Sequence, residues 1–150
     1  MALLKHKKDD PHSKLTALEN RIAVCTQYAK LWHDYGRFFS EGLQDRRISE
    51  QEEQQFFQII YLLASNHYRF TQLAGEFFKD GKAVLKVLSD TVSLQYIKSM
   101  SDAQFGQLLI DWHTLFIMMN KALGKLKALQ PPPEEQTSKK GKSRAAKAAA

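Results

Sequence analysis

The amino-acid sequence predicts an all-α protein: an antiparallel four-helix bundle of three long helices and one shorter third helix, followed by a disordered C-terminal tail. Apolar residues recur in steps of three and four along three long segments, which is the period of helices packed lengthwise on one another. Only seven Gly and four Pro occur in 150 residues, so few residues interrupt these segments. The predicted parts are a flexible segment at 1–12, a helical domain at 13–130 and the tail at 131–150.

The composition allows a substantial core. Hydrophobic residues make up 43% of the chain, and nine Phe, five Tyr and two Trp predict a core built on large rings. Cys25 is the only cysteine, so an intrachain disulfide and a cysteine-based metal site are excluded. Because Cys25 falls at a core spacing of the first helix, we expect it to be a small buried hydrophobic residue.

The first helix is predicted to run from Ser13 to Leu43. Ser13 or Thr16 is the expected N-cap, and Thr16 to Glu19 has the capping-box pattern. Its apolar seam steps regularly by three and four through Leu15, Leu18, Ile22, Cys25, Ala29, Trp32, Gly36, Phe39 and Leu43. Three of these residues are small, so an aromatic ring of a facing helix is expected to come close there.

The second helix is predicted to begin after Ser49, which opens a second capping box with Glu52, and to end near Lys79. Its seam comprises Phe56, Ile60, Leu63, His67, Phe70, Ala74 and Phe77. The apolar face is widened by Phe57, Ile59, Tyr61, Ala64 and Phe78. A face of this width predicts contact with two neighbouring helices.

A stop at Asp80–Gly81 precedes a short third helix over 82–98, and Ser101 and Gln104 form the capping box of a last helix that reaches Gln130. The seam of this last helix comprises Phe105, Leu109, Trp112, Phe116, Met119, Leu123 and Leu126. Because the third helix is about half as long as the others, part of the long seams should stay uncovered. Uncovered apolar strips are usually contact sites.

The two ends of the chain differ in character from the middle. Neither a signal peptide nor an apolar run long enough to span a membrane is visible, so a cytoplasmic location is expected. Pro131 to Pro133 end the last helix, and the residues after them lack large apolar side chains. Half of the net charge of +6 lies in the last twenty residues, so the helical domain itself is nearly balanced.

No pattern of catalytic or metal-binding residues emerges, and we predict no catalytic, cofactor or metal site. No Glu-x-x-His, His-x-x-x-His or Gly-x-Ser-x-Gly pattern occurs. His33, His67 and His113 lie on or beside the seams and could converge on haem or a metal, but their heights along the helices do not match. Pairing with neighbours such as Asp34 or Asp111 is the favoured interpretation.

These observations predict a non-catalytic protein-interaction module, an adaptor, scaffold or assembly subunit that binds a partner protein or itself through an apolar helix face. The candidate interface residues are Trp32, Phe39, His67, Phe70, Trp112 and Phe116. The alternative is a small nucleic-acid-associated subunit whose tail contacts phosphates, or another anionic surface, without sequence specificity. The tail residues in question are Lys139, Lys140, Lys142, Arg144 and Lys147.

Overall fold

The protein is all-helical over the residues that the structure describes, which confirms the predicted class. The structure is a computed structural model, and it describes residues 11–41, 43 and 47–131. Its helices are α2 (Pro11–Ser40), α3 (Glu50–Ala74), α4 (Gly81–Asp90), α5 (Leu94–Lys98) and α6 (Asp102–Ala128), with a 3₁₀ turn η1 (Gly75–Phe77). The predicted flexible segment, up to residue 10, and the tail after Pro131 lie outside the described residues.

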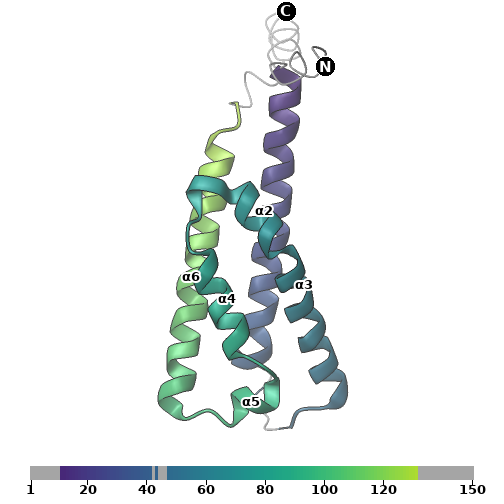
Figure 1. Ribbon diagram of the computed structural model, residues 1–150, viewed down its shortest axis with the longest axis vertical. Helices are drawn as coiled ribbons and strands as arrows, with labels where there is room; N and C mark the ends of the chain where they lie inside the picture. Colours follow the sequence, from purple (N-terminus) through teal and green to yellow (C-terminus); the bar gives the residue numbers. More distant parts are fainter. Residues whose placement is uncertain (1–10, 42, 44–46, 132–150) are drawn as a thin grey trace, which may run out of the picture.

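The long helices run side by side along the length of the molecule (Figure 1). α2 runs from one end of the molecule toward the other, α3 returns toward the end where α2 starts, α4 descends again, and α6 runs back along one edge. α2 makes the most extensive contacts, with α3 on one side and α6 on the other. The third predicted helix is two helices, so there are five helices in the described part of the chain instead of four.

Serine side chains cap the first turns of three helices, α3, α5 and α6. Ser101 and Gln104 form the predicted capping box of α6: each side chain accepts a hydrogen bond from the other residue's backbone N–H, at 3.2 Å. Ser49 caps α3 by accepting from the backbone N–H of Glu52 at 3.1 Å, as predicted. The expected start of the first helix is wrong, because α2 already begins at Pro11, a residue whose fixed φ suits a first helical turn.

The second long helix ends earlier than the sequence predicts. α3 stops at Ala74 because Gly75 adopts φ of +58°, a left-handed conformation that side chains with a Cβ rarely tolerate. The backbone N–H of Gly75 donates to the Thr71 carbonyl and closes the last turn. The expected stop at Asp80–Gly81 instead marks the start of α4.

The predicted third helix breaks because polar side chains satisfy the backbone there. Buried Thr91 bonds the Val87 carbonyl at 3.0 Å and also pairs with the Tyr35 hydroxyl. Beyond it, the Glu53 carboxylate of α3 accepts from the backbone N–H of Gln95 at 2.9 Å and also from that of Leu94. A carboxylate at the N-terminus of α5 favours a new helix start over continuation of α4.

The core consists of large rings, as the composition predicts. The largest fully buried side chains include Trp32, Tyr28, Tyr35, Phe39, Phe56 and Phe70. Tyr28 stacks on Phe70 of α3 with ring centroids 4.1 Å apart. Tyr28 and Tyr35 lie outside the predicted seam, because α2 is contacted on two sides and therefore buries a wider stripe than one seam.

Two tryptophans join α2 to α6, and we call Trp32 and Trp112 the indole pair. The Trp32 Nε1–H donates to the Trp112 carbonyl at 3.0 Å, and the Trp112 Nε1–H donates to the Trp32 carbonyl at 2.8 Å. The Trp112 ring lies directly over Gly36, where a Cβ would overlap it. The prediction that a ring approaches the small residues of the first seam is thus confirmed at Gly36.

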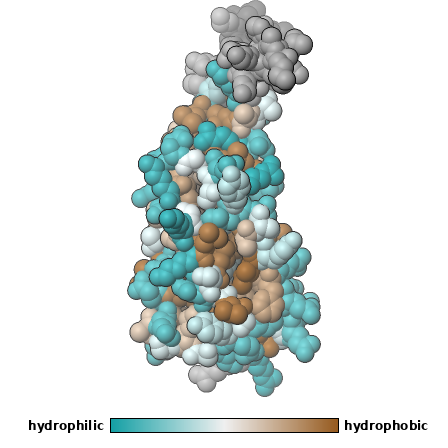
Figure 2. Space-filling view, in the orientation of Figure 1, coloured by the Kyte–Doolittle hydropathy of each residue, from teal (hydrophilic) through white to brown (hydrophobic). Residues whose placement is uncertain are grey.

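The width predicted for the apolar face of α3 is partly wrong. Phe57 and Tyr61 are 48% and 69% exposed, and Ala64 is exposed too, so these residues face solvent. The predicted contact with two neighbouring helices is nevertheless present, because α3 contacts both α2 and α4. Leu85 and Val92 are also exposed, and Figure 2 shows hydrophobic surface gathered over the middle of the face that α4 crosses. No described helix combines the length and the apolar character needed to cross a membrane.

Candidate interaction surface

The structure places the six predicted interface residues in two environments. Trp32, Phe39 and Phe70 are fully buried between the helices. His67, Trp112 and Phe116 are half-buried at the edges of the helix contacts. A partner that binds without opening the fold therefore reaches only these last three.

His67 lies at the contact between α3, α2 and the start of α4. Its Nδ1 is 3.5 Å from the Tyr28 hydroxyl, and a Cβ on Gly81 would lie 3.4 Å from its Nε2. Burial lowers the pKa of His67 below its ordinary value of 6.5, since desolvation penalises the imidazolium. The positive N-terminal end of α4 beside the ring acts in the same direction.

Acid is therefore expected to weaken the fold through His67. With a lower pKa in the folded state, the unfolded chain binds more protons as the pH falls below 6.5, so the free energy of unfolding decreases there and is level at higher pH. Urea unfolding at several pH values should show this decrease in the wild-type chain and a smaller one in His67→Gln. His67→Gln changes no other ionisable residue, so equal slopes in the two proteins would contradict the prediction.

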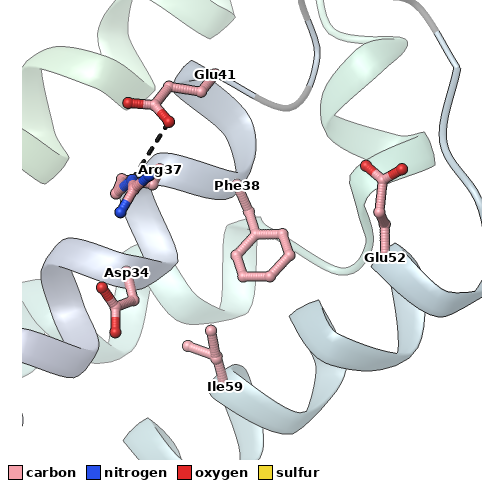
Figure 3. Close-up of a pocket in the computed structure, with 6 residues that line it drawn as sticks. All are labelled: Asp34, Arg37, Phe38, Glu41, Glu52 and Ile59. Atoms are coloured by element: carbon pink, nitrogen blue, oxygen red, sulfur yellow. Dashed lines mark hydrogen bonds and ion pairs between the residues drawn. The ribbon is translucent and has the colours of Figure 1, made fainter.

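A groove lies between the C-terminal half of α2 and the start of α3, and we call it the acidic groove. It measures about 460 Å³. Its lining residues are Asp34, Arg37, Phe38, Glu41, Glu52 and Ile59. Phe38 and Ile59 lie in the middle of the groove and face one another, with the charged residues around them (Figure 3). The Phe38 ring packs on the ring of Phe56, and the two ring centroids are 5.9 Å apart.

The rim of this groove is negative. Arg37 is the only cation among the described residues that line it, and the Arg37 Nε donates to Glu41 at 3.2 Å, so these two charges offset each other. Asp34 lies 3.7 Å from His33 Nδ1, which is a charged partner only when the imidazole is protonated. Glu52 accepts from the Ser49 hydroxyl at 3.2 Å. Asp34 and Glu52 thus leave an unbalanced charge of about −2 beside an apolar floor.

The acidic groove was not predicted from the sequence. Ile59 was predicted only as part of a wide apolar face, and no role was predicted for Phe38. Adjacent rings on a helix point about 100° apart, so a Phe–Phe pair at 38 and 39 indicates that one ring lies off the seam. That Asp34 and Glu52 border the same groove depends on the register of α2 against α3.

The reactive, metal-binding and basic side chains elsewhere provide no alternative site within the described residues. Cys25 is 1% exposed, and burial raises the pKa of its thiol to about 11, which confirms the predicted buried role. Within residues 11–41, 43 and 47–131, no three His, Cys, Asp or Glu side chains gather closely enough to hold a metal ion. The five basic tail residues, Lys139, Lys140, Lys142, Arg144 and Lys147, lie outside the described residues.

Comparison of the chain with protein-family models, with curated proteins and with solved structures finds no match. No relative therefore suggests a partner or an activity. The acidic groove is the described surface that best combines shape, apolar contact and charge, and it is the candidate functional site.

Proposed function

We propose that the protein is a non-catalytic interaction module whose acidic groove binds a basic segment of a partner protein. The observation that carries this proposal is the unbalanced charge of Asp34 and Glu52 beside the apolar floor of Phe38 and Ile59. A lysine or arginine of the partner can lay its aliphatic stem on the floor and direct its cation to the carboxylates. A cation over the Phe38 ring is favourable as well.

The helices around the groove are the scaffold in this proposal. α2, α3, the α4–α5 pair and α6 act together as an antiparallel bundle, and Glu53 of α3 ties α5 to the same end of the molecule as the groove. A groove between two helices that pack directly on each other needs little rearrangement to accept a segment, which reduces the entropic cost of binding. A cytoplasmic location is part of the proposal and rests on the sequence alone.

The nucleic-acid alternative depends on residues outside the described part of the chain. The described surface gives it little support, because the acidic groove carries carboxylates that repel phosphates. A tail that binds phosphates would lose affinity steeply with salt and would lose it completely on removal of residues 134–150.

The proposal is tested with two labelled amphipathic peptides, one built from Leu and Lys and the other with Glu in place of Lys, in a fluorescence-anisotropy titration. We expect the Lys peptide to bind and the Glu peptide to bind much more weakly. Asp34→Asn with Glu52→Gln should weaken Lys-peptide binding about fivefold, since two exposed ion pairs contribute roughly 0.5 kcal/mol each. Salt should reduce the difference between the proteins.

The matched control is Glu19→Gln with Glu76→Gln, which removes the same charge at exposed positions outside the groove. It should bind the Lys peptide like the wild-type protein. If the control loses as much affinity as the groove variant, the attraction is a general effect of net charge and the groove is not the site. Equal binding of the two peptides would also overturn the proposal.

A further inference from the structure

The outer side of α6 carries a second regular stripe that faces away from the core. Its members are Gly106, Ile110, His113, Ile117, Asn120 and Gly124, in steps of 4, 3, 4, 3 and 4. Ile110 and Ile117 are 60% and 42% exposed. We call this set the outer stripe.

The six residues of the outer stripe span about 27 Å and include no Lys, Arg, Asp or Glu, although Asp102, four positions before Gly106, and Lys121, four positions after Ile117, border them. The exposed side of α2, by comparison, carries Glu19, Lys30 and Arg37. A Cβ placed on Gly106 or Gly124 would have no other atom within 4 Å, so the helix surface is open there. Glycines on an exposed apolar stripe cost helix stability but let a second helix approach closely.

The charges beside the outer stripe are segregated along α6. Asp102 lies at the start of the helix, four positions before Gly106, and Lys121, Lys125 and Lys127 lie in the second half. Asp111 faces α4 and lies away from the stripe. If a second copy of α6 lies antiparallel, the acidic start of each helix meets the basic half of the other, and the helix dipoles oppose as well. A parallel copy would bring like charges together. The charge pattern therefore complements itself in one orientation only.

The positions of the residues along the outer stripe also favour an antiparallel pair. In an antiparallel pair centred near His113, Ile110 of one copy packs on Ile117 of the second copy, and Gly106 lies opposite Asn120. Such a two-fold contact uses one patch on both copies, which is the commonest geometry of homodimers. α6 also lies along one edge of the molecule, where no other described helix covers its outer side (Figure 1).

We propose that the protein forms a two-fold homodimer through the outer stripe of α6, packed antiparallel. This inference is independent of the acidic groove, which lies between α2 and α3. One helix pair of this length buries an area at the low end of stable interfaces, so the dimer should be weak and depend on concentration.

Sedimentation of the full chain from about 1 μM to about 500 μM tests the proposal, and we expect a monomer–dimer equilibrium in this range. Ile110→Lys with Ile117→Lys should weaken dimerisation about tenfold or more, with an unchanged circular dichroism spectrum because both side chains are exposed. The matched control is Tyr61→Lys with Tyr68→Lys, two exposed residues seven positions apart on α3. The control should dimerise like the wild-type protein.

The orientation is tested with two charge variants. One carries Lys121→Glu, Lys125→Glu and Lys127→Glu, and the other carries Asp102→Lys. Each should self-associate less than the wild-type protein, because the charges beside its outer stripe then have one sign, and an equimolar mixture should form heterodimers. A wild-type chain that stays monomeric at the highest concentration would overturn the proposal. Dimers that the isoleucine variant leaves unchanged, or a mixture that does not associate, would also overturn it.

Discussion

Gly36→Ala is expected to lower the free energy of unfolding by about 3 kcal/mol, a large effect for one added methyl group. The new Cβ would overlap the indole ring of Trp112, which lies directly on Gly36. The ring must move away, and the two reciprocal hydrogen bonds of the indole pair would then stretch or break. Overpacking and lost hydrogen bonds add to each other here, because the same ring takes part in both.

Urea or thermal unfolding measures this loss, with Gly106→Ala as the matched control. Gly106 lies inside α6, as Gly36 lies inside α2, but it has open space around its Cβ position, so alanine there should stabilise the chain by up to about 1 kcal/mol. A double variant, Gly36→Ala with Trp112→Leu, should show that Gly36→Ala costs much less once the ring is absent. If both glycine replacements stabilise the chain, the close approach of Trp112 to Gly36 is contradicted.

Trp32→Ala is expected to lower the free energy of unfolding by about 4 kcal/mol, since Trp32 is fully buried and its removal leaves a large cavity. Trp32→Phe should cost about 2 kcal/mol, because a ring remains but the Trp112 carbonyl loses its donor. Trp32→Phe keeps a ring and loses the hydrogen bond, whereas Trp32→Ala loses both. Comparing the two losses of unfolding free energy therefore separates ring packing from hydrogen bonding.

Both losses can be followed by urea unfolding with circular dichroism, and Trp32→Phe leaves Trp112 as the only source of tryptophan fluorescence. Phe57→Ala removes a ring that is 48% exposed and serves as the control, with an expected loss below about 1 kcal/mol. A loss for Trp32→Ala no greater than for Phe57→Ala would contradict the central place assigned to the indole pair.

Local signals in the sequence predicted the helical class and the ends of several helices. Ser49 and Ser101 act within three residues of themselves, so their caps could be recognised without knowledge of the fold. The end of α3 at Gly75 and the break before α5 could not be recognised in this way. A helix that continues through Gly75 is locally acceptable, and Glu53 reaches the start of α5 from 42 positions away.

Which side of each helix is buried was harder to predict than the existence of the helix. The predicted seam of α6 includes Phe105, Leu109 and Phe116, which are only half-buried, whereas Leu108 and Leu115 are buried. α6 is apolar on more than one side, so its sequence does not specify a single buried face. The acidic groove was missed for a related reason, since charged residues on two helices form a site only after the helices are aligned.

The indole pair also has a consequence for the nascent chain, because its members are 80 positions apart. A ribosome adds about 5–20 residues per second, so about 4–16 s pass between the synthesis of Trp32 and that of Trp112. During this interval α2 has its aromatic side chains but lacks the last helix that covers them. The chain therefore presents an apolar surface on the ribosome, where a chaperone that holds apolar segments can bind before α6 is complete.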